Sequence, residues 1–259
     1  MKILGLVIIL ALCLGAAGCV TNTNPGPTTP STTSAMVNIS SNGKSYPAYV
    51  SAPSSAGKYP GIVLLHSFNG LEPGYLTLVD MFAAEGYVVI APQWQTFNKS
   101  PDDEEVQALV VSGLSYLKTR PEVDIRQFGL TGFCAGGRYT MLFLPQMKDF
   151  RSGVAWYGFP YNGGFANETR PVDHSGELSV PMLMIHGSSD QASPVTDIYR
   201  YAEALNLSGK YFELKVYQGE PHGFMVQKGQ MNQSDVAMNA FKEMVEFFNR
   251  TLKGPGISL

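Results

Sequence analysis

Charged residues are scarce in this chain of 259 residues: Asp, Glu, Lys and Arg make up 15% of it, and the formal net charge is −3. No cluster of lysine and arginine forms the basic patch that binding of a nucleic acid requires. Apolar residues make up 44% of the chain, which suits a large core and argues against a disordered protein. We therefore expect one compact domain without a nucleic-acid partner.

Cysteine is scarcer still. The chain has three cysteines, and two of them, Cys13 and Cys19, lie within the first twenty residues. The third, Cys134, is left without a partner for a disulfide.

The N-terminus has the pattern of an export signal. Lys2 precedes an apolar run that reaches residue 14, and small residues follow up to Cys19. We predict a signal peptide over residues 1–19 whose end resembles a lipobox, the motif of prokaryotic lipoproteins, so that Cys19 is lipidated and becomes the new N-terminus. An uncleaved signal anchor is the alternative, because the apolar run is barely long enough to span a bilayer. Either one would tether the protein to a membrane.

The segment after the signal has the composition of a spacer. Residues 20–34 are rich in Thr, Pro and Ser and cannot form a core, so we place the folded domain at residues 35–259. Asn-x-Ser/Thr sequons are dense in that domain, which indicates a glycosylated protein at the outer face of the cell membrane. The predicted glycosylation sites are Asn38, Asn167, Asn206, Asn232 and Asn249; a sixth sequon, at Asn98, is weakened by Pro101. Exported proteins usually pair their cysteines, so the lone Cys134 calls for a chemical reason.

Strand and helix patterns alternate through the predicted domain. Strands are expected at 36–40, 48–51, 61–66, 87–91, up to 133, 153–157, 181–186 and 211–217, and helices at 76–85, 102–118, from 135, 195–207 and 234–252. This alternation predicts an α/β fold with a mostly parallel central sheet and helices on both faces. In such a fold, reactive groups collect at the carboxyl ends of the strands.

Cys134 lies where a predicted strand turns into a helix. It is the centre of the run Gly132-Phe133-Cys134-Ala135-Gly136, which has the form of the nucleophile elbow of α/β-hydrolases with cysteine in place of serine. Such a turn strains the nucleophile's backbone, and glycines on either side of it avoid clashes across the turn. The helix N-terminus favours a thiolate. A small buried cysteine in a Gly-rich turn is the alternative for this pattern taken alone.

Two later loops carry the partners that such a nucleophile needs. Asp190 lies just past the end of one predicted strand, and His222 lies just past the end of the next. The chain order of nucleophile, acid and histidine is that of α/β-hydrolases. His66 and His186 end strands themselves, and we assign them to holding their loops in place.

Taken together, these motifs resemble the dienelactone hydrolase family over residues 48–252. The likeness rests on the Gly-Phe-Cys-Ala-Gly-Gly-Arg run around Cys134, on the segment from His186 to Asp190, on Pro-His-Gly-Phe around His222, and on Ala-Trp-Tyr-Gly at 155–158. The resemblance implies an α/β-hydrolase fold and a catalytic triad of Cys134, Asp190 and His222. It also implies that the protein hydrolyses an ester or a lactone through a thioester intermediate.

The implied mechanism assigns a role to each group. His222 takes the proton of the Cys134 thiol, and Asp190 holds the imidazole in the required tautomer. The backbone N–H groups of Phe68 and Ala135 bind the oxyanion that forms when sulfur attacks the carbonyl. This chemistry needs no metal and no organic cofactor, and its partner is a small ester or lactone.

The chain departs from the family near the thiol. Dienelactone hydrolases carry a glutamate directly after the residue that matches His66, and this glutamate helps to keep the resting thiol neutral. Here that position is Ser67, so we hypothesise that Cys134 rests as a partial thiolate paired with His222. Glu72 is a candidate replacement for the glutamate.

A second departure concerns the substrate. Dienelactone-cleaving members carry an arginine for the substrate carboxylate just past the histidine, and this chain has Val226 there. Trp94, Phe97, Tyr157 and Phe159 are candidate pocket residues or plain core. With this lining, an apolar ester fits at least as well as an anionic lactone.

Other functions are compatible with the same motifs. One alternative is a cell-surface binding module on a hydrolase scaffold that has lost turnover, because a fold does not guarantee activity. Another is a peptidase or an acyl transferase that uses the same triad, because the shape of the pocket determines the leaving group.

Overall fold

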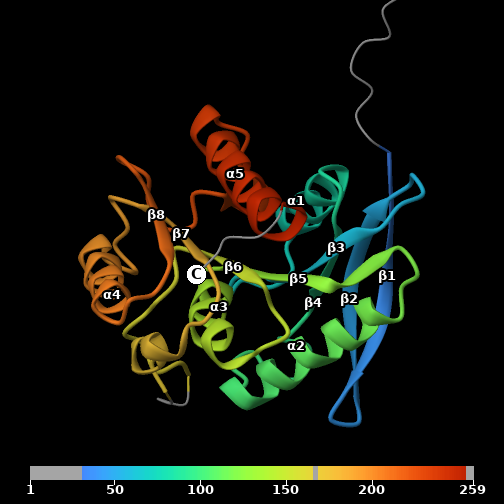
Figure 1. Cartoon of the computed structure of the whole chain (residues 1–259), viewed down its shortest axis with the longest axis horizontal. Coiled ribbons are helices and arrows are strands. Elements are labelled where there is room, and N and C mark those ends of the chain that lie inside the picture. Colours follow the sequence, from blue (N-terminus) through green and yellow to red (C-terminus); the bar gives the residue numbers. More distant parts are fainter. Residues whose placement is uncertain (1–30, 166–168, 255–259) are drawn as a thin grey trace, which may run out of the picture.

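A computed structural model describes residues 31–165 and 169–254. An eight-stranded sheet forms its centre (Figure 1). In sheet order, the strands are β1 (Thr32–Ser41), β2 (Lys44–Pro53), β4 (Val88–Pro92), β3 (Tyr59–Leu65), β5 (Val123–Phe133), β6 (Ser152–Trp156), β7 (Met182–Gly187) and β8 (Phe212–Tyr217). Strand β2 runs antiparallel to β1 and β4, whereas all the other neighbours in this sheet are parallel. The predicted mostly parallel sheet is therefore confirmed.

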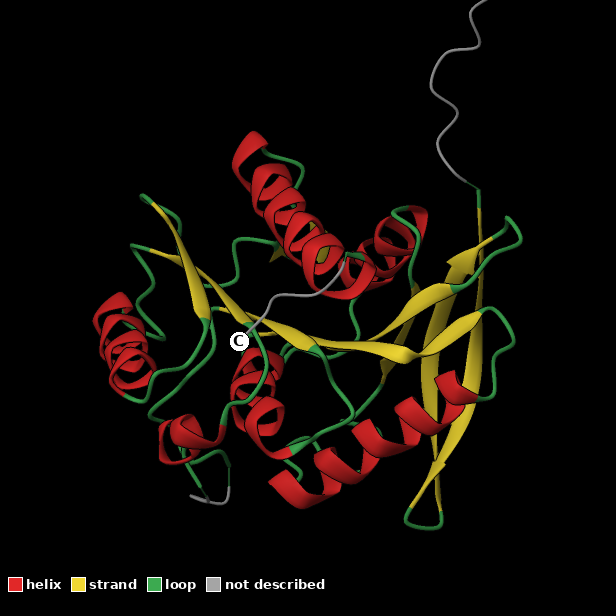
Figure 2. Ribbon diagram, in the orientation of Figure 1, coloured by secondary structure: helices red, strands yellow, loops and turns green. Residues whose placement is uncertain are grey.

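Helices cover both faces of the sheet, as predicted (Figure 2). Helices α1 (Pro73–Ala84) and α5 (Asp235–Phe248) pack on one face, and α2 (Asp103–Lys118), α3 (Ala135–Gln146) and α4 (Val195–Leu207) pack on the other. Each face has its own apolar core. Strand β3 contributes to both cores, because its side chains alternate: Ile62 and Leu64 belong to one, and Val63 and Leu65 to the other. This burial on both faces explains why the strand is an unbroken apolar run.

Side chains at the helix starts fix two of the boundaries. The Asp102 carboxylate accepts a hydrogen bond of 2.7 Å from the Glu105 N–H at the start of α2, and the Ser234 hydroxyl accepts one of 3.3 Å from the Ala237 N–H at the start of α5. Each bond satisfies a backbone donor that the helix itself leaves unpaired. Such a cap contributes about 1 kcal/mol to stability.

Several boundaries differ from those expected. Strand β1 begins at Thr32, three residues before the expected domain start at residue 35, because Thr32, Thr33 and Ser34 pair with β2. Composition alone assigns these polar residues to the spacer. The last helix is helical only to Phe248 in the α form and continues as a π-helical turn over Asn249–Lys253.

Three short elements were not anticipated by the sequence patterns. A 3₁₀ helix spans Pro171–Glu177, and a two-stranded hairpin pairs β9 (Val226–Gln227) with β10 (Gln230–Met231). The hairpin follows His222 directly and contacts the start of α1, where the Gly74 N–H donates a hydrogen bond of 2.9 Å to the Gly229 carbonyl. It therefore connects the histidine loop to a helix on the same face of the sheet.

Several predictions concern residues outside the described ranges: the signal peptide over 1–19, lipidation of Cys19, and glycosylation of Asn167. Within 31–165 and 169–254, no helix has the length and apolarity to cross a membrane. Of the other sequons, Asn38, Asn98 and Asn206 are exposed. Asn232 is half-buried and its amide nitrogen donates to the Phe224 carbonyl, and Asn249 accepts from the Tyr87 hydroxyl. These two bonds make Asn232 and Asn249 poorer acceptors for a glycan than the exposed sites.

Candidate active site

Cys134 occupies a strained turn between β5 and α3. Its backbone has φ 59° and ψ −114°, a conformation that costs a non-glycine residue on the order of 1–3 kcal/mol. A Cβ atom on Gly132 would overlap the Gly136 carbonyl, and one on Gly136 would overlap the carbonyl of Leu65 at the end of β3. Both glycines are thus required, but for different reasons: Gly132 faces the turn itself, and Gly136 faces the neighbouring strand.

A third glycine, Gly137, is required for a reason that the motif does not reveal. A Cβ atom there would overlap the Trp156 carbonyl at the end of β6. The same carbonyl accepts a hydrogen bond of 3.0 Å from the Cys134 N–H. Close packing of α3 against β6 therefore fixes the backbone on which the sulfur is carried.

The structure brings Asp190 and His222 together beside this turn. Asp190 follows β7 and His222 follows β8, and the Nδ1 atom of His222 lies 2.7 Å from Oδ2 of Asp190. The other carboxylate oxygen accepts backbone N–H bonds of 2.9 Å from Ala192 and 2.8 Å from Ser193. Because a carboxylate only accepts hydrogen bonds, Nδ1 carries a proton and donates it to Asp190. Nε2 is the ring nitrogen that is left to interact with Cys134.

The two loops that carry these residues are joined to each other. The Ser189 N–H donates a hydrogen bond of 3.0 Å to the Glu220 carbonyl, so Glu220 flanks the site through its backbone. The His222 ring packs against two aromatic rings, with centroid distances of 5.1 Å to Tyr157 and 5.3 Å to Phe159. These contacts hold the imidazole in one orientation.

The charges of the site follow from burial and these bonds. Burial alone would raise the pKa of Asp190, but the bonds from His222 and from the Ser193 N–H outweigh it and lower the pKa. Burial alone would lower the pKa of His222, but the bond to Asp190 and the interaction with Cys134 outweigh it and raise the pKa from 6.5 to about 9. The Nε2 atom is buried and makes no hydrogen bond within the described residues, so its contact with the sulfur is a loose one. The arrangement can transfer a proton between sulfur and Nε2.

His66 and Trp94 fix the loop that carries Phe68. The Nδ1 atom of His66 lies 2.7 Å from the Ser67 carbonyl, and a carbonyl only accepts, so Nδ1 carries the proton. The ring stacks on Trp94 at a centroid distance of 4.9 Å, and the Trp94 indole N–H donates to the His66 carbonyl. In a trans peptide the N–H points opposite to the C=O, so the Phe68 N–H points away from the imidazole. Burial lowers the pKa of His66 to about 4, which keeps the ring neutral.

His186 also holds a loop, as expected from the sequence. Its Nε2 atom lies 2.8 Å from the Ser193 carbonyl and 3.4 Å from Oδ2 of Asp190. Burial lowers its pKa. A neutral His186 thus lies against Oδ2 of Asp190, whereas the backbone donors bind Oδ1.

Two buried tyrosines interact electrostatically with Cys134, and sequence reasoning missed one of them. Cys134 interacts with the hydroxyl groups of Tyr75 and Tyr157, and the Tyr75 hydroxyl also interacts with the Ser67 hydroxyl. Burial raises the pKa of both tyrosines, so both hydroxyl groups stay protonated and uncharged. The candidate replacement Glu72 precedes α1 and interacts with Tyr75. Tyr75 lies in an ordinary apolar helix pattern, which gives no signal of this role.

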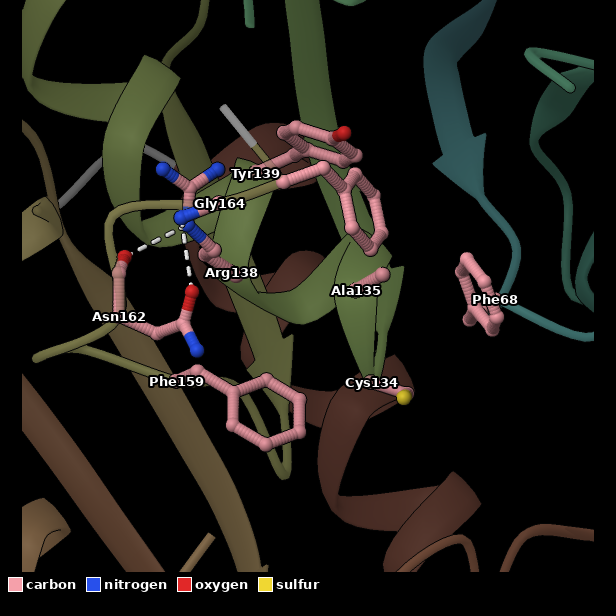
Figure 3. Close-up of a pocket in the computed structure, with 9 residues that line it drawn as sticks. Phe68, Cys134, Ala135, Arg138, Tyr139, Phe159, Asn162 and Gly164 are labelled. Atoms are coloured by element: carbon pink, nitrogen blue, oxygen red, sulfur yellow. Dashed lines mark hydrogen bonds between the residues drawn. The ribbon is translucent and has the colours of Figure 1, made fainter. Parts of the chain in front are cut away.

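A cavity of about 240 Å³ opens beside Cys134 (Figure 3). Phe68 and Phe159 lie on opposite sides of the sulfur, and Ala135 lies above it in this view. The lining residues are Phe68, Cys134, Ala135, Arg138, Tyr139, Phe159, Asn162, Gly164 and Phe165. Most of these present apolar atoms, so the cavity suits an apolar group.

The remaining residues that the sequence suggested for the pocket do not line the cavity. Phe97 is 55% exposed and packs edge-on against Tyr46 at 5.0 Å, so it is not a pocket residue. Trp94 stacks on the His66 ring, and Val226 packs against the start of α1 at Gly74. Within the described part of the chain, no group of three His, Cys, Asp or Glu side chains is arranged to hold a metal ion.

Known proteins share this sequence pattern and fold. A protein from Methylorubrum extorquens named "Putative carboxymethylenebutenolidase" is 29% identical over 184 residues, which cover 68% of this chain and 63% of that protein. An Escherichia coli K12 protein of the same name is 25% identical over 233 residues, covering 83% of this chain and 86% of its own. The chain thus spans less than two thirds of the first relative and most of the second.

Solved structures with this fold include one described as a dienelactone hydrolase and one described as a peptidase. A protein from Klebsiella pneumoniae described as a "Putative Dienelactone Hydrolase" has a TM-score of 0.77 and 24% identity, covering 85% of this chain and 100% of that one. The Pyrococcus horikoshii acylaminoacyl peptidase has a TM-score of 0.74 and 18% identity, covering 88% of this chain and 43% of that one. At these identities the likeness establishes the fold alone.

The family model described as "Dienelactone hydrolase family" matches residues 46–252. This range contains the elbow at Cys134 and the two loops that carry Asp190 and His222. The chain therefore belongs to the dienelactone hydrolase family.

Proposed function

We propose that this protein hydrolyses an ester or a lactone, with Cys134 as nucleophile, His222 as acid and base, and Asp190 as the partner of the imidazole. The observation that carries the proposal is the strained Cys134 turn beside a histidine whose Nδ1 atom is bonded to a buried carboxylate. Two curated relatives named for carboxymethylenebutenolidase activity support the same chemistry.

The first half of the reaction forms a thioester. The thiol proton passes to Nε2 of His222, and the sulfur attacks the carbonyl carbon of the substrate. The tetrahedral oxyanion is bound by the N–H groups of Phe68 and Ala135. Ala135 is the first residue of α3, so its N–H is not used within the helix. His222 then returns the proton to the leaving oxygen as the bond between carbon and oxygen breaks.

The second half restores the enzyme. Nε2 of His222 removes a proton from water, and the resulting hydroxide attacks the thioester carbonyl. The bond between carbon and sulfur breaks, the acid leaves, and the thiolate takes the proton back from His222. Asp190 remains ionised throughout and stabilises the positive charge of the imidazole.

Kinetics on the purified full chain test this proposal. We expect turnover of p-nitrophenyl acetate and of a simple aryl lactone, with a cysteine-bound acetyl group detectable by mass spectrometry after rapid quenching. Cys134→Ala should lower kcat/KM at least about 10³-fold, whereas the exposed control Ser189→Ala should leave it unchanged. Absence of both turnover and acylation would favour the binding module, and faster cleavage of the matched p-nitroanilide would favour a peptidase.

We also propose that the chain is exported and tethered to the outer face of the cell membrane, either through a lipid on Cys19 or through an uncleaved anchor. The support is the pattern of residues 1–34 together with the exposed sequons at Asn38 and Asn206. Mass spectrometry of the mature N-terminus distinguishes a lipidated Cys19 from an intact Met1. A mature chain that starts at neither residue, or that lacks a membrane fraction, would contradict the proposal.

A further inference from the structure

We infer that the acyl group accepted by Cys134 is uncharged and about the size of a phenyl ring, and that a substrate carboxylate is excluded from the acyl site. The inference rests on the proposed function, because it names the group that the sulfur would receive. It is carried by the position, the size and the charge of the cavity beside Cys134.

The position of the cavity identifies it as the acyl site. The leaving oxygen of the substrate must lie at Nε2 of His222, which supplies its proton. His222 is not part of the lining, whereas Phe68 and Ala135, the two proposed oxyanion donors, are. A carbonyl bound by these donors has its leaving group toward His222 and its acyl substituent toward the cavity.

The size of the cavity limits the acyl group. A protein cavity of about 150 Å³ holds one benzene molecule, and this cavity measures about 240 Å³. A phenyl ring with a one-carbon link to the carbonyl, or an unbranched chain of about six carbons, therefore fills it. An acetyl group would leave most of it empty and would lose the gain of burying apolar surface.

The charge of the cavity argues against an anionic acyl group. Arg138 is the one cation of the described lining, and its side chain is 4% exposed. Its guanidinium binds both carboxylate oxygens of Asp103, at 2.6 and 2.7 Å, and also donates to the carbonyls of Asn162 and Thr169 at 2.8 and 2.9 Å. Four of its five N–H donors are thus occupied. The carboxylate of Asp103 cancels its charge, so a second carboxylate in the cavity would be buried without a partner.

A second cation, Lys99, lies near Phe68, but it does not provide a partner for a carboxylate inside the cavity. Lys99 is exposed, and its ammonium is 5.3 Å from the centroid of the Phe68 ring. It does not line the cavity. Because Lys99 is exposed to water, its attraction for a charged group bound in the cavity is weak.

Three p-nitrophenyl esters tried on the full-length protein test the inference: phenylacetate, acetate and the monoester of glutaric acid. We expect kcat/KM for the phenylacetate to exceed that for the acetate about tenfold or more, and to exceed that for the glutarate at least tenfold. Equal or faster cleavage of the glutarate would overturn the inference while leaving the proposed hydrolase intact. Loss of all three activities, without acylation of Cys134, would instead contradict the proposed function.

Variants at Asp103 test the role of the charge. Asp103→Asn keeps the shape but removes the charge that neutralises Arg138, so the ratio of glutarate to phenylacetate kcat/KM should rise about tenfold. Glu104→Gln removes an equal charge from the same turn of α2, but at an exposed position, and should leave the ratio unchanged. If Asp103→Asn does not fold, Phe165→Arg adds a cation at a lining residue that is 45% exposed and should raise the ratio as well. An unchanged ratio in the folded variants would contradict the inference.

Discussion

His222 links the charge of the site to the stability of the fold. The contacts with Asp190 and Cys134 raise its pKa from 6.5 to about 9. A raised pKa stabilises the folded state fully below pH 6.5, and this stabilisation is lost as the pH rises to about 9. The free energy of unfolding of the wild type should therefore fall, relative to that of His222→Gln, by up to about 3 kcal/mol between pH 6.5 and 9.

Urea unfolding at pH 6, 7.5 and 9 measures this difference. Unfolding of the Cys134→Ala variant separates the effect of the sulfur on the pKa of His222 from the effect of Asp190. This variant lacks the sulfur but keeps the bond to Asp190. We expect its pH dependence to lie between those of the wild type and His222→Gln. Parallel pH profiles for all three proteins would show that His222 is not stabilised by its partners.

His66 acts on the proposed oxyanion site through one peptide group. Because its imidazole holds the Ser67 carbonyl, His66→Leu should let the Phe68 N–H rotate and should lower kcat about 10- to 100-fold with little change in KM. His66→Asn places an amide donor where Nδ1 lies and should recover most of the loss. Steady-state kinetics of the two variants check this, and equal losses in both would assign His66 to packing alone.

The elbow is an element whose stability depends on glycine. A Cβ atom on Gly136 would overlap the Leu65 carbonyl in β3, so Gly136→Ala should force α3 away from the sheet and lower the free energy of unfolding by about 3 kcal/mol or more. Gly176 is exposed, and nothing lies near its added Cβ atom. Gly176→Ala is thus a matched control, and similar thermal melting of the two variants would contradict the packing argument.

Helices and strands could be predicted from the sequence where one periodic pattern of apolar residues extends over the whole element. The alternation of apolar strand patterns with helix patterns predicted a mostly parallel sheet with helices on both faces, and the run around Cys134 predicted the turn between β5 and α3. The order of the strands within the sheet was not predicted. The hairpin after His222 was not predictable, because each of its strands has only two residues and no periodicity can be read over such a length. Strand β1 was assigned too late because the pairing with β2, rather than the composition, determines its start.

The arrangement of the candidate site could be predicted for the residues that belong to recognisable motifs. Cys134, Asp190 and His222 follow strand ends, and parallel strands bring their carboxyl ends to one edge of the sheet. Tyr75 and the neutralisation of Arg138 by Asp103 depend on contacts across the fold. Such contacts leave no pattern in a single sequence.

At the scale of the whole molecule, the N-terminal strand β1 forms one edge of the sheet and covers the more deeply buried strand β2. Removal of residues 1–30 leaves β1 intact, so a chain that begins at Ser31 should melt at the temperature of the full-length protein. Removal of residues 1–41 makes β2 the edge strand. Most of β2 is buried, whereas most of β1 is exposed, so the new edge presents more apolar surface beside its unpaired backbone and promotes aggregation. Thermal melting with light scattering compares the two chains. Equal solubility would mean that β1 is dispensable.

Cys134 is the one cysteine beyond residue 19 in the whole sequence, and it is partly accessible at the mouth of a cavity. A thiol-directed reagent with an uncharged aryl group therefore has one target in the folded domain. One bound label would correspond to one competent molecule. The same residue proposed to perform the chemistry can thus serve as a quantitative titrant of active protein in purified samples of the domain that begins at Ser31.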